Sequence, residues 1–146
     1  MKPNEVYLVI TKWAKNGDAE FIERYIKEEV SSTIGTTEAA GVTASFMATV
    51  YGSLKSMGIK LNGIRLTHLE ENFAKKVTNK KAEDVDKHNL LRVCYAVLTG
   101  LAKGIEEKTK DKTPVEKATF NSIIQHIKGL QKAIVELQEK SSFQSA

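Results

Sequence analysis

The chain has little cysteine and proline and no long uninterrupted hydrophobic run. One cysteine and two prolines occur among 146 residues. A single cysteine forms neither an internal disulfide nor a multi-cysteine zinc site, so we expect a reducing, cytoplasmic setting. No stretch approaches the roughly 20 apolar residues that a membrane-spanning helix needs, and no signal-peptide pattern is present. With 41% hydrophobic residues, the sequence predicts a folded soluble domain.

Motifs of the common catalytic and cofactor sites are also absent. The sequence contains no Walker loop, no dinucleotide-binding glycine motif, no nucleophile elbow, no HExxH motif and no EF-hand loop. Its three histidines, His68, His88 and His126, are not paired with one another at helical spacing, whereas a zinc site needs three or four converging ligands. We therefore predict that the protein is not an enzyme and has no catalytic residues, metal site or cofactor.

Apolar residues recur at intervals of three and four along most of the chain, the spacing of helical faces. Cap signals divide this pattern, at Asp18 and most clearly at Thr113-Pro114-Val115-Glu116, where a cap, a proline and a capping-box glutamate coincide. The sequence predicts an all-α fold, a compact bundle of five to six helices forming one domain over residues 1–140 and a frayed tail over 141–146. The expected helices span about 4–16, 18–30, 36–57, 67–77, 82–107 and 113–140.

Two of these helices are apolar around most of their circumference, and we predict that both are central and largely buried. The third carries a ridge of small residues at Ala40, Ala44, Ala48 and Gly52, beside a narrow polar strip that includes Thr49 and Ser53. The fifth contains Cys94 on its apolar side and two glycines, Gly100 and Gly104. Because glycine lowers helix propensity by about 1 kcal/mol, this pair suggests a close helix crossing.

The last helix has a heptad pattern that is typical of a helix–helix seam, and we expect this helix to lie across the central pair. Its apolar positions follow intervals of three and four, and they are Phe120, Ile123, Ile127, Leu130, Ile134 and Leu137. This seam predicts an oligomer interface, in a homodimer or with a protein partner. The same pattern would also serve packing within the chain.

The positive charge is concentrated in the middle of the chain. The net charge is +4, and residues 75–112 alone hold 10 basic and 6 acidic residues. Such a cluster can neutralise phosphates, so nucleic-acid binding is an alternative function, although the acids that follow closely favour a solvated loop. The residues that would bind are Lys75, Lys76, Lys80, Lys81, Lys87, Arg92 and Lys103.

Two weaker patterns leave further alternatives open. Acidic pairs at Glu20/Glu23 and Glu83/Asp86 are similar to those with which all-α nucleotide pyrophosphatases hold magnesium, which implies a metal-dependent nucleotide hydrolase. Residues 37–50 resemble a helix-turn-helix, with Gly41 as the turn glycine. That segment offers no Arg, Lys, Asn or Gln to read base edges, so a continuous core helix is the preferred interpretation.

The sequence as a whole favours a non-enzymatic helical binding or assembly protein that acts through surface contacts. Two helices that are apolar on most sides are difficult for 146 residues to cover, which favours a partner or self-association. A small, basic chain without catalytic motifs is typical of accessory factors encoded by viruses and mobile elements.

Overall fold

The computed structural model describes residues 10, 12–13, 18–32, 36–56 and 87–144. These residues form four α-helices and no strand, which confirms the all-α class. The helices are α2 (Ala19–Ser32), α3 (Thr36–Ser56), α5 (Lys87–Thr109) and α6 (Pro114–Gln144). The helices expected at 4–16 and 67–77 fall mostly or wholly outside the described residues, so a total of five to six helices is not established.

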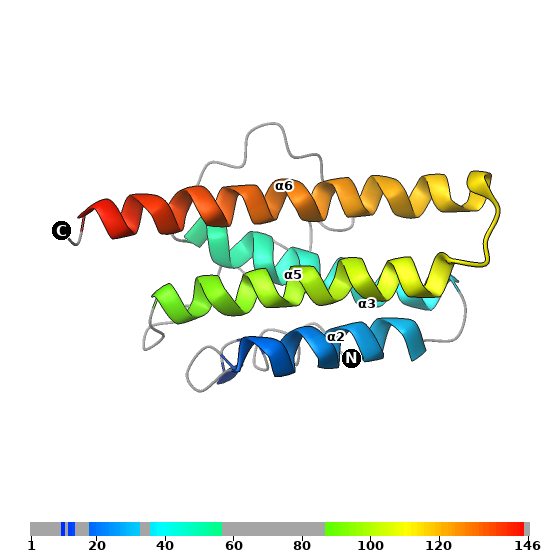
Figure 1. Ribbon diagram of the computed structural model, residues 1–146, viewed down its shortest axis with the longest axis horizontal. Helices are drawn as coiled ribbons and strands as arrows, with labels where there is room; N and C mark the ends of the chain where they lie inside the picture. Colours follow the sequence, from blue (N-terminus) through cyan, green and yellow to red (C-terminus); the bar gives the residue numbers. More distant parts are fainter. Residues whose placement is uncertain (1–9, 11, 14–17, 33–35, 57–86, 145–146) are drawn as a thin grey trace.

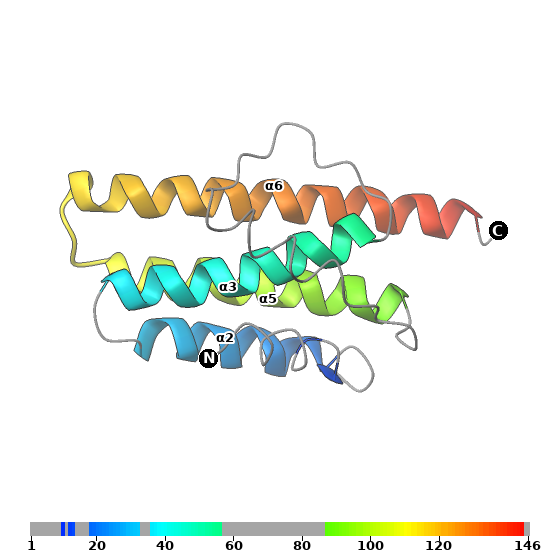
Figure 2. The same cartoon turned by 180° about the vertical axis from the view of Figure 1, so that it is seen from behind.

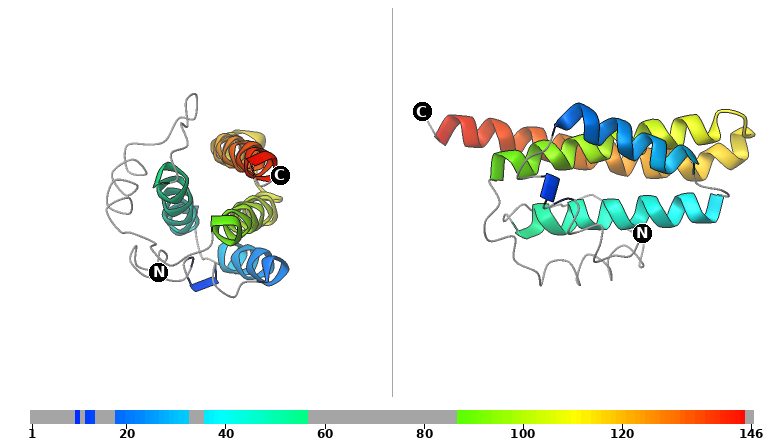
Figure 3. Two further views of the ribbon diagram at one scale, coloured as in Figure 1. Left: turned by 90° about the vertical axis from the view of Figure 1, so that its left-hand side faces the viewer. Right: turned by 90° about the horizontal axis from the view of Figure 1, so that it is seen from below.

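Three of the helices lie side by side in one curved layer, with α5 in the middle (Figures 1 and 3). Helix α2 packs along one side of α5 and α6 along the other, while α3 lies across the inner face and contacts all three. The same arrangement seen from behind places α3 in front of α5 (Figure 2). Helix α6 runs antiparallel alongside α5, rather than across the central helices as the sequence had suggested.

Local signals set where the helices begin. The Oδ1 atom of Asp18 accepts hydrogen bonds from the backbone N–H groups of Glu20 (2.9 Å) and Phe21 (3.4 Å), which confirms the predicted N-cap of α2. Helix α6 begins at Pro114, and the carbonyl of Thr113 accepts the N–H of Lys117 at 2.9 Å. Helix α6 then extends to Gln144, beyond its expected end near residue 140.

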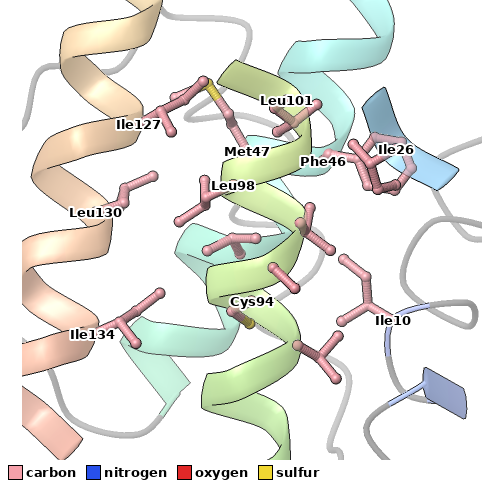
Figure 4. Packing of buried hydrophobic residues seen from close by; sticks show 14 of the residues in the cluster. Ile10, Ile26, Phe46, Met47, Cys94, Leu98, Leu101, Ile127, Leu130 and Ile134 are labelled. Carbon is pink, nitrogen blue, oxygen red and sulfur yellow. The ribbon is translucent and has the colours of Figure 1, made fainter. Parts of the chain in front are cut away.

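The core is a single hydrophobic cluster built around α5. Leu98, Leu101 and Cys94 of α5 are fully buried, and side chains from the neighbouring helices converge on them (Figure 4). Helix α3 contributes Phe46 and Met47. This cluster explains why α5 is apolar around most of its circumference: it has a packed neighbour on three sides.

Helix α3 is continuous from Thr36 to Ser56 and therefore passes through Gly41 without the turn of a helix-turn-helix. Ala48 is fully buried, as the small-residue ridge predicts, whereas Ala44 is only half-buried. The structure also buries Thr49 and Ser53, which the sequence placed on a polar strip.

These two buried hydroxyl groups are satisfied within their own helix. Thr49 Oγ1 donates to the carbonyl of Ser45 and Ser53 Oγ to the carbonyl of Thr49, both at 2.9 Å. A hydroxyl that is hydrogen-bonded to the carbonyl four residues earlier is buried at little cost. The hydrogen bonds within α3 therefore allow these two hydroxyl groups to face the interior.

The contact between α2 and α5 is unusually close because two glycines of α5 face α2. A Cβ atom added at Gly100 would lie 2.5 Å from the carbonyl oxygen of Glu23 and 2.8 Å from Cβ of Ile26. One added at Gly104 would lie 2.6 Å from Cβ of Val30. The predicted close crossing is thus confirmed, and its partner is α2.

Two ion pairs, one turn apart along this contact, fix its direction. Lys103 of α5 pairs with Glu23 of α2, and Lys27 pairs with Glu107 at 3.3 Å. A step of four residues along α2 therefore corresponds to a step of four along α5 in the same direction, so the two helices run parallel.

Gly100→Ala is expected to lower the free energy of unfolding by about 1–3 kcal/mol, because the added methyl group forces α2 away from α5. The matched control is Gly41→Ala in α3, where a Cβ atom would meet nothing within 4 Å. That change is expected to raise stability by about 0.5–1 kcal/mol through helix propensity alone. Urea unfolding, monitored by circular dichroism, measures the free energy of unfolding of both variants. Equal changes in this free energy would contradict the close contact between α2 and α5.

Candidate functional site

The outer face of the helix layer, on the side of α5 away from α3, carries the most distinctive surface of the described chain. A polar strip of α5 lies here: His88, Arg92 and Lys103 are exposed and Thr99 is half-buried. Tyr95 interrupts this polar strip and is 40% exposed. Helices α2 and α6 border the strip on its two sides (Figure 3).

A groove of about 400 Å³ crosses this face and contacts all three helices. We call it the outer groove. Helix α5 supplies its floor, α2 one wall and α6 the other. Its lining residues are Ala19, Glu23, Arg92, Tyr95, Ala96, Thr99, Val135 and Gln138.

The outer groove combines small, apolar and charged groups. Ala96 is buried, and its small side chain forms part of the groove floor. Tyr95 and Val135 project apolar surface to solvent, Val135 with 38% of its area exposed. Glu23 and Arg92 add one charge of each sign. Such a mixture suits recognition of a protein surface better than recognition of a small apolar ligand.

A hydrogen bond between α5 and α6 holds the α6 side of the outer groove in place. The Nε2 amide of Gln131 donates to Thr99 Oγ1 at 2.7 Å and lies 3.4 Å from the carbonyl oxygen of Tyr95. The two contacts join α6 to the α5 residues of the groove floor. Val135, one turn further along α6, is thereby placed opposite Tyr95.

A second hollow of about 440 Å³ adjoins the outer groove, sharing Glu23 with it, and is lined by charged groups only. Its residues are Glu20, Glu23, Arg24, Lys27 and Lys103. Two of its three cations are already paired with carboxylates, Lys103 with Glu23 and Lys27 with Glu107. The neutralised charges make this hollow a poor site for an isolated anion.

Two aromatic residues of α2 and Trp13 form a row. The Trp13 and Tyr25 rings meet edge to face with centroids 5.5 Å apart, and Phe21 stacks on Tyr25 at 6.2 Å. Phe21 is 48% exposed, while Trp13 and Tyr25 pack against the core. The row therefore anchors the Trp13 segment to α2, with its outer end in solvent.

Only part of the predicted nucleic-acid site can be located. Lys75, Lys76, Lys80 and Lys81 lie outside the described residues, as does the side chain of Lys87. Arg92 and Lys103 both lie on the exposed face of α5; Lys103 pairs with Glu23, and Arg92 lines the outer groove together with the same carboxylate. The described part of this surface is therefore mixed in charge rather than uniformly basic.

The predicted oligomer seam of α6 faces the interior of its own chain. Ile127, Leu130 and Ile134 are fully buried and point toward α5 and α3 (Figure 4). Phe120 is buried as well, and Ile123 and Leu137 pack against the same core. A partner could reach these side chains only if α6 left the bundle.

The residues proposed for chemistry do not converge within the described part of the chain. Glu20 and Glu23 lie in the charged hollow, among cations, while Glu83 and Asp86 fall outside the described residues. No group of three or more His, Cys, Asp or Glu side chains that could hold a metal ion occurs among the residues searched. Nor does any helix of this part reach the length and apolarity that crossing a membrane requires.

The sequence did not predict the outer groove, because its walls come from helices far apart in the chain. Tyr95 was the available signal, since it is a large aromatic residue on a strip whose other members are polar. Val135 gave a similar signal on α6, where it lies outside the heptad positions. Both residues line the outer groove.

The thiol of Cys94 is fully buried, and burial raises its pKa from 9.0 to about 12. Below pH 9 the group is therefore a neutral thiol and a poor nucleophile.

We expect a thiol reagent at pH 8 to modify Cys94 in the native protein far more slowly than in the protein unfolded in guanidinium. Absorbance of the chromophore that the reagent releases measures the labelling rate. Rapid labelling of the native state would contradict the burial of Cys94.

Comparison of the chain with protein-family models, curated proteins and solved structures gives no match. No residue role can be transferred to it from a relative. Its function has to be inferred from the outer groove and the other surfaces described above.

Proposed function

We propose that the protein is a non-enzymatic helical binding protein that uses the outer groove to bind a helical segment of a protein partner. The observation that carries this proposal is the groove itself, in which exposed Tyr95 and Val135 flank the small residue Ala96. Aromatic residues are enriched in protein interfaces because they bury a large area at little entropic cost. Small residues beneath them let a partner approach closely.

The shape of the groove favours a helix as the bound element. Two helices border it and a third forms its floor, so a further helix would extend the same ridge-into-groove packing that builds the bundle. An amphipathic helix would place its apolar side on Tyr95 and Val135. Its polar flanks would then meet Glu23 and Arg92, both of which line the groove.

The rigidity of the site supports the same role. Its floor is the central helix α5, which neighbours cover on three sides, and Gln131 links the α6 side to that floor. A preformed surface loses little conformational entropy on binding. Each groove residue lies on a helix rather than on a loop.

Val135→Glu is expected to abolish binding, because it introduces a second carboxylate opposite Glu23 and removes apolar contact area. Val115→Glu is the matched control, since Val115 is also on α6, is 83% exposed and lies about five and a half turns away. The experiment immobilises the parent chain and both variants and identifies captured proteins from the source lysate by mass spectrometry. The expected result is a protein that the parent and Val115→Glu retain but Val135→Glu does not.

Two outcomes would contradict this function. Identical captured proteins for all three chains would show that the outer groove is not the contact surface. The parent chain could instead bind immobilised DNA, with a retention that decreases as salt rises and that Arg92→Glu reduces. This result would favour the nucleic-acid alternative, whose described residues are Arg92 and Lys103.

A further inference from the structure

We infer that the helix bound in the outer groove is acidic: it carries a carboxylate one turn from its apolar contact residues, and this carboxylate pairs with Arg92. The inference rests on the proposed function, because it names the chemistry of the partner in the same groove. Its basis is that the groove has an apolar centre at Tyr95, Ala96 and Val135 and one charge that no described residue pairs with.

Along α5, the groove residues follow one another at intervals of about one helical turn. Arg92 precedes Ala96 by four residues and Thr99 follows it by three, so the three side chains lie on one face of the helix. Arg92 therefore stands about 6 Å along the helix axis from Ala96. A helix laid along α5 would meet Arg92 and the apolar centre with residues that are one turn apart.

Glu23 lies at the opposite end of the outer groove, and its charge is compensated there. Its backbone carbonyl packs against Gly100 of α5, which is about 12 Å beyond Arg92 along the helix axis. Its carboxylate contacts the ammonium group of Lys103, which lies further still from Arg92 along α5. The carboxylate of Glu23 is thus directed away from Arg92, and the apolar centre lies between the two charges.

Arg92 is the charge that a partner can compensate. Its side chain is exposed, and no carboxylate among the described residues forms a salt bridge with it. The charges that line the outer groove and the charged hollow, together with Glu107, comprise four cations and three carboxylates. A partner that brings a carboxylate neutralises this excess, whereas a partner that brings a cation adds to it.

Binding makes this pairing matter more than exposure alone suggests. A helix seated on the apolar centre removes water from the adjacent Arg92, and a charge that loses water without gaining a partner lowers affinity. A carboxylate can accept two parallel hydrogen bonds from a guanidinium group. The pair therefore selects acidic helices over neutral and basic ones that offer the same apolar surface.

The phosphates of a nucleic acid would also compensate Arg92, but they fit the rest of the groove less well. Binding along a phosphate backbone uses a row of cations. Here the charge next along the groove is Glu23, and Tyr95 and Val135 present apolar surface between the two charges.

Selection from a helix library tests the inference. The probe is a phage-displayed library of alanine-based helices of about 18 residues, long enough to be helical in water, with the positions of one face randomised. Helices enriched on the immobilised parent are expected to carry Asp or Glu one turn from an apolar residue. Helices enriched on Arg92→Glu are expected to carry Lys or Arg at that position instead.

Arg24→Glu is the matched control for net charge. Arg24 is exposed and lines the charged hollow but not the outer groove, so this variant changes the total charge as Arg92→Glu does. It is expected to enrich the same acidic helices as the parent. Circular dichroism verifies that both variants, which change exposed residues, keep the fold.

A charge exchange with one selected helix measures the contact itself. The helix is synthesised as a fluorescent peptide, and anisotropy gives its dissociation constant. Arg92→Glu, or replacement of the peptide's carboxylate by Lys, is each expected to raise this constant about tenfold. The two changes together should restore tight binding, because the pair is then present with its charges reversed.

The outcomes separate failure of this inference from failure of the proposed function. Helices whose enrichment depends on Val135 but that show no acidic preference would overturn the acidic partner and leave the groove as a helix-binding site. An acidic preference that Arg24→Glu removes as fully as Arg92→Glu would do the same, because net charge would then explain it. If the parent enriches no helix relative to Val135→Glu, both the inference and the proposed function are wrong.

Two other occupants of the groove would be recognised in the same experiments. A parent that sediments at twice the chain mass of 16.2 kDa and that Val135→Glu makes monomeric would assign the groove to a second copy of the chain. Retention on immobilised DNA that requires Arg92, without enrichment of any helix, would assign Arg92 to phosphates. Either result would overturn the acidic helix.

Discussion

The bundle depends on the close approach of α2 to α5, which requires the absence of side chains at Gly100 and Gly104. Both positions sit against backbone or Cβ atoms of α2 at distances that leave no room for a methyl group. Because α2 lies so near, Ile22, Ile26 and Val30 reach the core and are fully buried. The same approach sets the width of the outer groove, since α2 forms one of its walls.

Features governed by neighbouring residues could be predicted from the sequence. The Asp18 cap, the start of α6 at Pro114 and the burial of Cys94 follow from local signals, and the structure confirms them. The close crossing at Gly100 and Gly104 was also predictable, because two glycines within one helix reduce its stability unless packing compensates. The sequence did not predict which helix lies against these glycines, because α2 precedes them by about 80 residues.

Features that depend on the assembled bundle could not be read from helical periodicity. A heptad pattern is the same whether its seam faces a second chain or the chain's own core, and here Ile127, Leu130 and Ile134 face the core. Thr49 and Ser53 look like solvent-facing residues until their hydroxyl groups are seen bonded to carbonyls of α3. The outer groove needs residues from α2, α5 and α6 together, so only its single projecting members were visible in the sequence.

The parallel pairing of α2 with α5 has a consequence for how the chain folds. Helices α5 and α6 are joined by residues 110–113 only, so their antiparallel contact closes a short loop and can form early. The Glu23–Lys103 contact joins residues 80 positions apart, and contacts of such high sequence separation slow folding. We therefore expect the α5–α6 hairpin to be the first stable unit. The glycine face of α5 would then remain open to solvent until α2 docks, late in the folding reaction.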